Sequence, residues 1–595
     1  MLDGDLLGNR PGRPPRSLPG DLPTAAGGGD AVTTIDARGE TTFDDWDGRL
    51  VPYPPDRARR HRETGSWSAD PTGRRFHEIA VRHPDRPAVI TAEGSMTYAE
   101  LDRRTDAVAA GLIELGLRRL EPVVFQLTNR LGTVLAWYGC LKAGLVPVAT
   151  LAAHRMHEIG HVSRTVGAVA HIVEVGDPAL DLVRFAHEHA AGGDTVRQIL
   201  TVGAPSAVPG SIRLEDLGVD IDPSAARDAV EAIERDIDPQ DVAAFQLSGG
   251  TTGVPKVIPR IHAEYWNNAE MYARWLGWDE TSRVAHLIPI IHNAGIVCGL
   301  HASHSVGACL VLATADSVSA FDLMERAGAT EVLIGHGHYQ AVMDPGFDRV
   351  RGQLRRVVLS GAKVSPDLMA RVDDGRTRWG GQLFGMSEGM FAVTPLAAPL
   401  QARVETVGTP IAPDDEVRIL EPGTETEVPD GVVGELCCRG PYTIVGYFDA
   451  AEHNRSAFTA DGFYRTGDLA TIVVIDGVRY VSIEGRIKDL INRGGEKINA
   501  EELEFLLVEH PGIDDAAVVA MPDPRLGEKT CAYLVAARDE LSLAEIREHL
   551  TRLGVAKFKW PERIEWIPAL PRTTVNKIDK KSLRADVAAK VLADR

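Results

Sequence analysis

Leu-Ser-Gly-Gly-Thr-Thr-Gly-Val-Pro-Lys, residues 247–256, is the segment with the most specific pattern in this chain. It gathers three glycines, three hydroxyl side chains and one lysine directly after the apolar run 242–245. Glycines leave the backbone free to turn its N–H groups inward as an anion nest, hydroxyls add donors, and Lys256 supplies a cation. A strand that opens into such a loop predicts a polyphosphate site in an α/β fold.

The loop differs from the Walker A pattern, because Val257 rather than Ser or Thr follows Lys256 and the glycine spacing is different. Taken alone, the loop is also compatible with a flexible surface turn, since glycine-rich turns are common in proteins. The remaining motifs of the chain decide between these two interpretations.

From Arg75 onward, apolar segments of strand length alternate with helix-like patterns such as the amphipathic segment 98–115. The strand-like segments include 87–90, 122–125, 332–334 and 357–359. This alternation favours an α/β architecture with mostly parallel sheets. Between Glu405 and Gly446 the strands become short and are interrupted by Gly, Pro and Asp, which predicts a β-barrel or an antiparallel β unit.

A different pattern begins after Gly485-Arg486-Ile487-Lys488-Asp489. Helices are predicted at 500–509 and 543–553, and strands at 516–520 and 531–535. The pattern is typical of a small α+β domain of about 100 residues. We therefore predict three parts: a disordered tail at 1–45, a large domain of two mostly parallel sheets plus a β-barrel subdomain at 46–486, and a small, mobile C-terminal α+β domain at 487–595.

Composition limits the class of protein. The chain has 595 residues, 44% hydrophobic content and a net charge of -20, which disfavours nucleic acid and anionic membranes as partners. Its six cysteines show no CxxC spacing, which indicates a reduced, cytoplasmic protein. The apolar stretch 295–313 contains two histidines and three glycines, so we predict a buried core segment there rather than a membrane span.

The loop at 247–256 resembles the phosphate loop of the adenylate-forming superfamily, which includes acyl-CoA synthetases, luciferases and the adenylation domains of nonribosomal peptide synthetases. The wording Gln-Leu-Ser-Gly-Gly-Thr-Thr-Gly, residues 246–253, and the following Ile-Pro-Arg, residues 258–260, are most similar to stand-alone aryl acid-AMP ligases. The leader segments 53–56 and 62–67 resemble that group as well. The resemblance covers roughly residues 46 to 585.

Four further motifs occur in the order that the family shows. They are Ser-Gly-Ala-Lys at 360–363, Leu-Phe-Gly-Met-Ser-Glu at 383–388, Tyr-Arg-Thr-Gly-Asp at 464–468 and Gly-Arg at 485–486. The resemblance implies an ATP site that comprises Ser248, Gly249, Gly250, Thr251, Thr252, Gly253, Lys256, Gly361, Ala362, Lys363, Phe384, Gly385, Met386, Ser387, Asp468 and Arg486. A carboxylate such as Asp468 is suited to both ribose hydroxyls, and Glu388 is the implied ligand of Mg²⁺. No organic prosthetic group is expected.

Lys577, in Leu-Pro-Arg-Thr-Thr-Val-Asn-Lys at 570–577, resembles the family's catalytic lysine. The substrate carboxylate must approach the α-phosphate although both are anionic, and a bridging cation lowers this repulsion. In isolation, Lys577 could equally belong to a solvated basic face together with Lys580 and Lys581. Asn576 stands where the family usually has Gly, and Asn tolerates left-handed backbone nearly as well. Lys488 resembles the hinge about which the small domain turns.

The segment Ile-Pro-Ile-Ile-His-Asn-Ala-Gly, residues 288–295, resembles the wall of the aryl acid pocket. In that resemblance His292 controls the entry of the carboxylate and Asn293 contacts an ortho substituent, whereas a helix-capping pair is the alternative. Three positions depart from the pattern: Ala294 replaces a Tyr, Cys298 disfavours a second ring hydroxyl, and the 333–338 wall carries Gly335 and His336. Together with Gly361, these residues predict a pocket for a bicyclic or substituted hydroxy acid.

We therefore predict an enzyme that uses ATP and Mg²⁺ to convert an aryl acid into an aryl-adenylate, which is then transferred to a thiol. The thiol belongs to the phosphopantetheine of a carrier protein, expected in trans because few residues follow Lys577, or to free coenzyme A in the alternative of an aryl-CoA ligase. A catalytically inactive sensor would be expected to lack Lys577, Glu388 or Asp468, and all three are present.

Overall fold

The computed structural model describes residues 33–35, 41–43, 46, 48–177, 180–193, 195–248, 255–493, 496–553, 555, 557–573 and 577–594. Its contacts divide the chain into Met1–Asp45 and Trp46–Arg595. Within the first unit, strands β1 (Thr33–Ile35) and β2 (Thr41–Phe43) pair antiparallel. The tail predicted at 1–45 otherwise lies outside the described residues.

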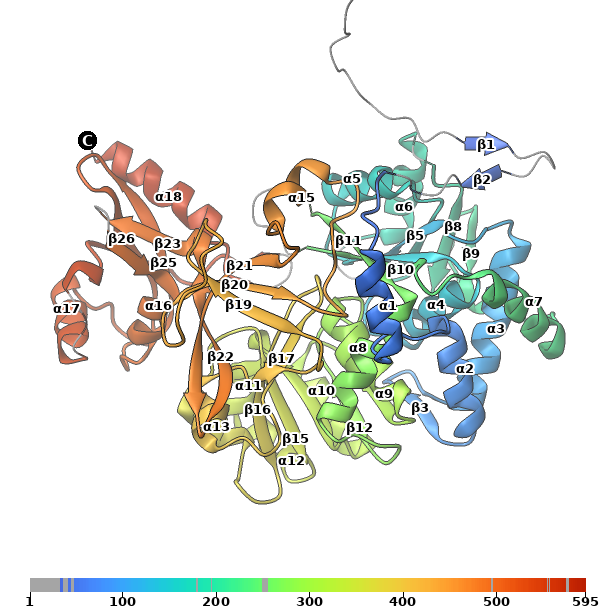
Figure 1. Ribbon diagram of the computed structural model, residues 1–595, viewed down its shortest axis with the longest axis horizontal. Helices are drawn as coiled ribbons and strands as arrows, with labels where there is room; N and C mark the ends of the chain where they lie inside the picture. The colour runs from blue at the N-terminus through green and yellow to red at the C-terminus, as the bar shows by residue number, and fades with distance from the viewer. Residues whose placement is uncertain are drawn as a thin grey trace, which may run out of the picture. The chain divides into compact units, whose positions relative to one another are not determined.

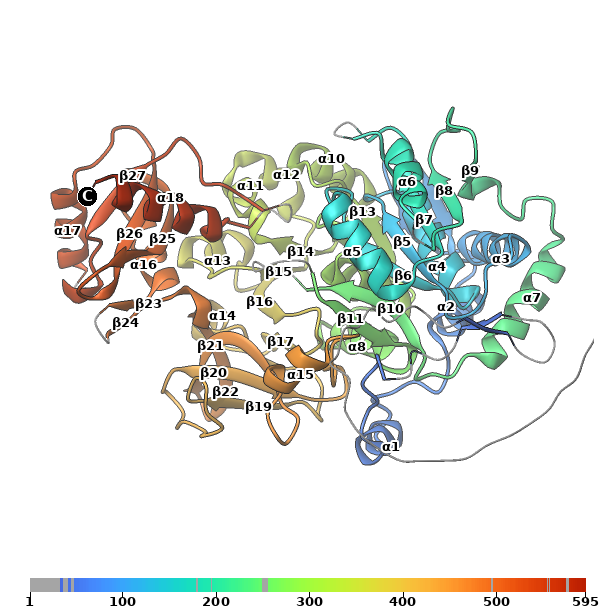
Figure 2. The same cartoon turned by 90° about the horizontal axis from the view of Figure 1, so that it is seen from above.

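The first large sheet has seven strands. In spatial order they are β11 (Val257–Ile261), β10 (Val242–Leu247), β6 (Val146–Thr150), β5 (Pro122–Gln126), β7 (Ala170–Glu174), β8 (Gln198–Val202) and β9 (Ser211–Arg213). All pairs are parallel except β10 with β11. Helices α5 (Met156–Val166) and α6 (Leu182–Ala191) lie on one face, and α3 (Tyr98–Glu114) and α4 (Leu131–Lys142) lie on the other side (Figure 2).

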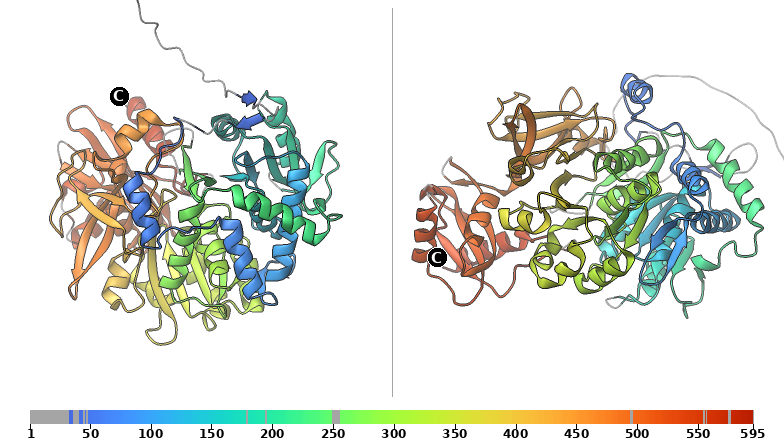
Figure 3. Two further views of the ribbon diagram at one scale, coloured as in Figure 1. Left: turned by 45° about the vertical axis from the view of Figure 1, so that its right-hand side comes forward. Right: turned by 90° about the horizontal axis from the view of Figure 1, so that it is seen from below.

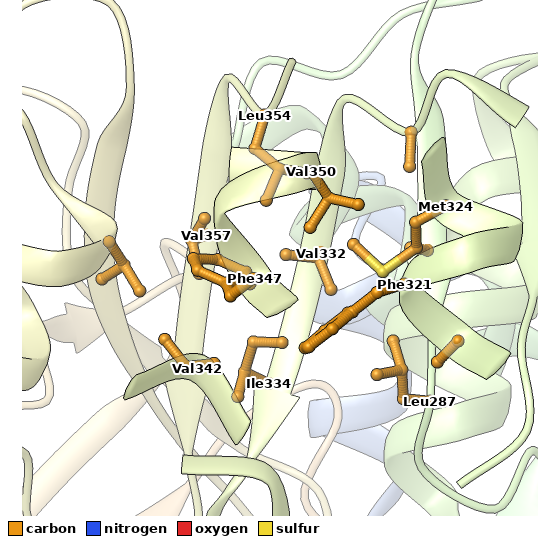
Figure 4. Packing of buried hydrophobic residues seen from close by; sticks show 14 of the residues in the cluster. Leu287, Phe321, Met324, Val332, Ile334, Val342, Phe347, Val350, Leu354 and Val357 are labelled. Carbon is orange, nitrogen blue, oxygen red and sulfur yellow. The ribbon is translucent and has the colours of Figure 1, made fainter. Parts of the chain in front are cut away.

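The second large sheet has nine strands. In spatial order they are β18 (Thr409–Pro410), β17 (Phe391–Val393), β16 (Trp379–Gly385), β15 (Arg356–Ser360), β14 (Glu331–Gly335), β12 (Arg283–His286), β13 (Cys309–Leu312), β3 (Pro87–Ile90) and β4 (Ser95–Thr97). The six strands from β16 to β3 are parallel. Their core includes Phe321 and Met324 of α10 (Ser317–Ala327) against Val332, Ile334 and Val357 (Figure 4).

Helices connect and cover these sheets (Figure 1). The remaining α-helices of this part are α1 (Pro55–Glu63), α2 (Thr72–Arg82), α7 (Pro223–Asp236), α8 (His262–Trp275), α9 (Ala302–Ser305), α11 (Tyr339–Met343), α12 (Asp348–Arg351), α13 (Pro366–Val372), α14 (Leu400–Glu405) and α15 (Ala451–Ala457). Three single turns are 3₁₀: η1 (Leu214–Asp216), η3 (His336–His338) and η4 (Pro345–Phe347). The segment η2 (Gly295–His301) is a π-helix, a form found mostly at functional sites.

A third sheet is antiparallel, with the order β19 (Glu416–Leu420), β20 (Gly434–Arg439), β21 (Tyr464–Ile475) and β22 (Val478–Arg486). The change to short strands near Glu405 marks its start, but the sequence interpretation ended it at Gly446 and so included only two of its four strands. The second half of β21 is a largely apolar run like those of the parallel strands, whereas β22 mixes apolar and polar residues. Cys437 and Cys438 belong to different buried clusters, as expected for neighbours on a strand.

The C-terminal part is a small α+β unit (Figure 3). Its sheet contains β24 (Glu496–Asn499), β23 (Leu490–Arg493), β26 (Gly527–Ala536), β25 (Ile513–Asp523) and β27 (Arg563–Trp566), and it is preceded by η5 (Ile487–Asp489). Helices α16 (Ala500–Val508) and α17 (Leu543–Arg552) pack on one face, and α18 (Lys580–Ala593) packs on the other; η6 is Lys557–Lys559. The predicted small α+β fold is confirmed, with each helix and strand longer or shorter by a few residues.

The apolar stretch 295–313 is buried in the core, as predicted. It forms η2, α9 and β13, and its histidines His301 and His304 are fully buried. Trp137 donates to Nε2 of His301 at 3.0 Å, and Tyr138 hydrogen-bonds Nδ1 of His304 at 2.8 Å. Among the described residues, no helix combines the length and the apolar character that crossing a membrane requires.

Buried neutral histidines predict acid sensitivity of the fold. Burial lowers the pKa of His262 to about 3, and its Nδ1 lies 3.2 Å from the backbone nitrogen of Thr72. Because the folded pKa lies below the unfolded value, the stabilisation is complete above about pH 6.5 and is lost as the pH falls toward 3. His262→Asn keeps a hydrogen-bond acceptor for Thr72 but has no group that titrates in this range. Between pH 7 and pH 5, the free energy of unfolding of the wild type should therefore fall by roughly 2 kcal/mol more than that of the variant. Urea unfolding at several pH values measures this difference, and parallel curves for the two proteins would contradict it.

Candidate active site

Two hydrogen bonds between Ser248 and Lys256 join the two ends of the phosphate-type loop. The backbone nitrogen of Ser248 donates to the carbonyl of Lys256 at 3.0 Å, and the backbone nitrogen of Lys256 donates to Oγ of Ser248 at 3.1 Å. The ammonium of Lys256 lies 5.8 Å from the ring centroid of Tyr447. The predicted residues Gly249, Gly250, Thr251, Thr252 and Gly253 lie outside the described residues.

Three predicted segments meet at one edge of the nine-stranded sheet. Gly335 pairs with Ser360, and Ser360 pairs with Leu383, so strands β14, β15 and β16 end side by side. Gly361, Ala362 and Lys363 follow β15, and Gly385, Met386 and Ser387 end or follow β16. Gly361 has φ +102°, a conformation that side chains disfavour. Phe384 is half-buried and packs against two apolar clusters.

Arg260 is fully buried and connects four segments of the site. Its Nε and Nη2 bind both carboxylate oxygens of Glu264, at 2.7 and 2.6 Å. Its Nη1 donates to Oδ1 of Asn293 at 3.2 Å and to the carbonyl of Ser387 at 3.0 Å. Burial lowers the pKa of Arg260, but the carboxylate of Glu264 outweighs that effect and raises it, so the guanidinium stays charged. Arg260 lies at the end of strand β11 and Glu264 in the first turn of helix α8, so no helical spacing in the sequence indicated this pair.

Asn293 is buried and already engaged by protein atoms. Its Oδ1 accepts from Arg260 and, at 3.1 Å, from the hydroxyl of Tyr265, and its Nδ2 donates to the carbonyl of Met386 at 3.3 Å. An amide group has two acceptor sites and two donor hydrogens. Within the part of the chain that the structure describes, one donor hydrogen is left for a ligand. In the predicted contact to an ortho substituent, Asn293 can therefore act only as a hydrogen-bond donor.

His292 precedes the π-helix η2, Ala294 is the N-cap residue of η2, and Cys298 lies within it. Nδ1 of His292 accepts from the backbone nitrogen of Ala294 at 3.2 Å. Surrounding protein lowers the pKa of His292 to about 4, and the charge of Lys577 contributes. The ring is nevertheless exposed to solvent, which is the environment of a group that lines an open site. Ala294 is half-buried, and Cys298 is buried within η2, which contacts helix α8.

Glu388 is held by a tyrosine that the sequence did not single out. The hydroxyl of Tyr447 donates to Oε1 of Glu388 at 2.7 Å and lies 2.9 Å from the hydroxyl of Tyr464. Next to it, a Cβ on Gly389 would lie 1.9 Å from the carbonyl of Tyr442, so only glycine fits there. A carboxylate oriented in this way is a suitable ligand for Mg²⁺. No motif placed Tyr447 beside Glu388, because 59 residues separate them.

Asp468 and Arg486 face each other across strands β21 and β22. They are register partners, and Nε of Arg486 lies 3.0 Å from Oδ1 of Asp468. Burial raises the pKa of Asp468, although the charges of Arg486 and Lys577 oppose the increase. The charge of Asp468 raises the pKa of Arg486. The two predicted ATP residues therefore form one charged pair at the end of the antiparallel sheet.

Lys577 reaches this site from the C-terminal unit. Surrounding protein lowers its pKa, the charge of Arg486 adds to the effect, and Asp468 opposes it. Its side chain remains exposed to solvent, like that of His292. The preceding residues, Thr574 to Asn576, lie outside the described residues. A cation from the small unit thus lies among the predicted nucleotide and carboxylate residues.

Other predicted residues lie where the small unit meets the large one. Burial lowers the pKa of His336, and the charge of Arg572 in the small unit contributes. The ammonium of Lys363 lies 5.2 Å from the ring centroid of Phe505 in α16. The carbonyl of Lys488 accepts from Nη2 of Arg584 at 3.3 Å. His336 therefore has a neighbour in the small unit that its motif did not indicate.

The fold, the order of the motifs and the charged residues that meet at the site define an adenylate-forming enzyme. Comparison with known proteins supports this class. The AMP-binding enzyme family model matches residues 76–448, and the AMP-binding enzyme C-terminal domain model matches residues 502–577. The chain belongs to this AMP-binding enzyme family.

Within the family its group is that of the aryl acid-AMP ligases. The chain is 37% identical to a salicylyl-CoA synthase / salicylate adenylyltransferase of Streptomyces sp, over 91% of this chain and 98% of that protein. It is 34% identical to the 2,3-dihydroxybenzoate-AMP ligase of Bacillus subtilis, over 91% of this chain and 98% of that protein. The apo structure of Mycobacterium smegmatis MbtA aligns with a TM-score of 0.67 and 34% identity, over 91% of this chain and 99% of that one.

The Arg260–Glu264 pair gives a stability test. Arg260→Leu leaves the Glu264 carboxylate buried without a partner, so it should lower the free energy of unfolding by about 3–5 kcal/mol. The double variant Arg260→Leu/Glu264→Leu should recover most of that loss but not the activity, because Asn293 and Ser387 lose their donor. Urea unfolding and pyrophosphate exchange measure the two effects.

A pair within helix α8 whose arginine is exposed provides the control. Arg274 and Glu270 are also four residues apart, and the side chain of Arg274 is 69% exposed. Arg274→Leu should cost less than about 1 kcal/mol. Equal losses for Arg260→Leu and Arg274→Leu would contradict the importance of the buried pair.

Proposed function

We propose that this protein activates a hydroxylated aryl carboxylic acid with ATP, releases pyrophosphate and transfers the aryl group from the adenylate to a thiol. The observation that carries this proposal is Lys577, a cation from the C-terminal unit that lies within electrostatic reach of His292, Asp468 and Glu388. The carboxylate of the acid attacks the α-phosphate in line, and the P–O bond to the leaving pyrophosphate breaks. Lys577 lowers the repulsion between the two anions as charge moves to the pyrophosphate.

The nucleotide site is proposed on the following support. The loop from Ser248 to Lys256 offers backbone N–H groups and a cation to the phosphates. Asp468 suits the ribose hydroxyls, with Arg486 beside it toward the phosphates. The turn Gly361–Lys363 and the segment Phe384–Ser387 flank the space for adenine. Glu388 would hold Mg²⁺, which neutralises phosphate charge when it is bound.

The acid pocket is proposed to be larger than that of the catechol-using relatives. Ala294 in place of an aromatic residue frees space of the order of an extra ring. Cys298 offers a second hydroxyl only a weak partner, and Gly335 and Gly361 leave the strand ends without side chains. His292 would gate the carboxylate. Asn293 would donate its remaining hydrogen to an ortho oxygen, and His336 would close the pocket beside the small unit.

The acceptor thiol is proposed to be the phosphopantetheine of a carrier protein in natural-product biosynthesis, with free coenzyme A as the second candidate. Arg552, Lys557 and Lys581 give the C-terminal unit exposed cations, which would suit an acidic carrier. The two half-reactions need different faces of that unit over one site, so a turn about Lys488 is part of the proposal. The boundary between a large domain at 46–486 and a small domain at 487–595 belongs to the same proposal. The Streptomyces relative is a salicylyl-CoA synthase / salicylate adenylyltransferase, which supports testing both thiols.

Lys577→Ala tests the reaction. Without the cation, aryl-adenylate formation measured by pyrophosphate exchange should fall at least about a hundredfold. Transfer from chemically prepared aryl-adenylate to the thiol should remain, because that half-reaction does not join the two anions. Lys581→Ala, a nearby exposed cation in α18, is the control. Unchanged exchange in Lys577→Ala would overturn the assigned role.

An acid panel tests the pocket. We expect hydroxynaphthoate, hydroxyquinoline carboxylate or hydroxyanthranilate to give a higher kcat/KM in pyrophosphate exchange than 2,3-dihydroxybenzoate. Ala294→Tyr should reverse the preference toward smaller acids by about tenfold or more, since it refills the space. A wild-type preference for 2,3-dihydroxybenzoate over every larger acid would show that the pocket is not enlarged.

A further inference from the structure

A buried chain of hydrogen bonds leads from strand β10 to Asn293, and no motif assigned its middle residue a role. Nε2 of Gln246 donates to the hydroxyl of Tyr265 at 2.9 Å, and this hydroxyl donates to Oδ1 of Asn293 at 3.1 Å. All three side chains are buried. Gln246 belongs to β10 and Tyr265 to α8, so the hydrogen bonds join a strand and a helix to the segment before η2.

The direction of each hydrogen bond is defined by its partners. The amide nitrogen of Gln246 can only donate, so the hydroxyl of Tyr265 accepts from it and directs its own hydrogen to Asn293. Burial raises the pKa of Tyr265, so the hydroxyl keeps that hydrogen. Nη1 of Arg260, which also can only donate, lies 3.2 Å from the same oxygen of Asn293. Two donors therefore hold this oxygen, and the amide nitrogen points to the other side, where it donates to the carbonyl of Met386.

The ring of Tyr265 is itself held in place. The guanidinium carbon of Arg260 lies 4.6 Å from the ring centroid, and the ring of His301 is edge-on to it at 5.5 Å. The side chain of Tyr265 is fully buried, so its hydroxyl acts on a bound acid through Asn293 and not by direct contact. Tyr265 is therefore suited to orient Asn293.

We propose that Tyr265 is a positioning residue that holds the amide of Asn293 so that an N–H faces the ortho group of the acid, and that it thereby selects acids with an ortho hydroxyl. The inference rests on the proposed function and adds the residue that sets this selectivity. In an ortho-hydroxy acid the hydroxyl donates to the neighbouring carboxylate, so its oxygen presents lone pairs outward. An N–H is complementary to these lone pairs, whereas an amide turned over would place its own oxygen against them.

Tyr265→Phe tests the proposal, because it removes only the hydroxyl. In pyrophosphate exchange, kcat/KM for 1-hydroxy-2-naphthoate and for salicylate should fall about tenfold, as expected for one hydrogen bond. The values for 2-naphthoate and benzoate, which lack the ortho hydroxyl, should change by less than about twofold. The ratio within each pair of acids is independent of the fraction of the enzyme that folds. The KM for ATP should stay unchanged.

Two further variants separate positioning from a structural role. In an Asn293→Ala background, Tyr265→Phe should no longer alter the ratio within a pair of acids, since its effect passes through Asn293. Tyr272→Phe is the control, because Tyr272 is another fully buried tyrosine of α8 and its hydroxyl has no hydrogen-bond partner among the described residues. This variant should leave the ratio as in the wild type.

An equal loss for hydroxylated and unhydroxylated acids in Tyr265→Phe, or no loss for either, would overturn the proposal. Absence of exchange with every aryl acid in the wild type would contradict the proposed function instead. Calorimetric titration of both proteins with salicylate and benzoate then decides on Tyr265. The proposal stands if the wild type prefers salicylate and the variant does not, and it falls otherwise.

Discussion

The buried guanidinium of Arg260 is the constraint on which the site depends. A charge without access to water needs partners for its donors, and Arg260 finds them in Glu264, Asn293 and Ser387. These residues belong to helix α8, to the approach to η2 and to the segment after β16. The requirement to satisfy one cation therefore fixes the position of the segment around Asn293, the proposed acid-pocket wall, relative to the segment around Ser387, the proposed nucleotide segment.

Parallel strands supply the second level of organisation. Because β14, β15 and β16 are in register, their carboxyl ends open into the same space, where backbone groups and small residues can approach a ligand. The antiparallel sheet adds the pair of Asp468 and Arg486 from another direction. Lys577 lies in the C-terminal α+β part of the chain, and its charge acts on Asp468 and on His292.

Much of the fold followed from the sequence because its pattern is local. Alternating strand-like and helix-like segments predicted largely parallel sheets, and helix α16 begins at Ala500 as predicted. The antiparallel sheet was only half identified, and the apolar run of β21 is like those of buried parallel strands. The π-helix η2 was not predicted, because its sequence also fits an ordinary helix.

The sequence by itself determined the class of chemistry, because the wording and the order of its motifs resemble those of the adenylate-forming superfamily and such motifs are local in the chain. Tertiary structure decided which of those groups are free to act. The acceptor oxygen of Asn293 is already bound by Arg260 and Tyr265, and the charge of Arg572 acts on His336. The contact of Tyr447 with Glu388 is apparent only in the tertiary structure. Hydrogen bonds between residues distant in the chain leave no spacing that a linear pattern can show.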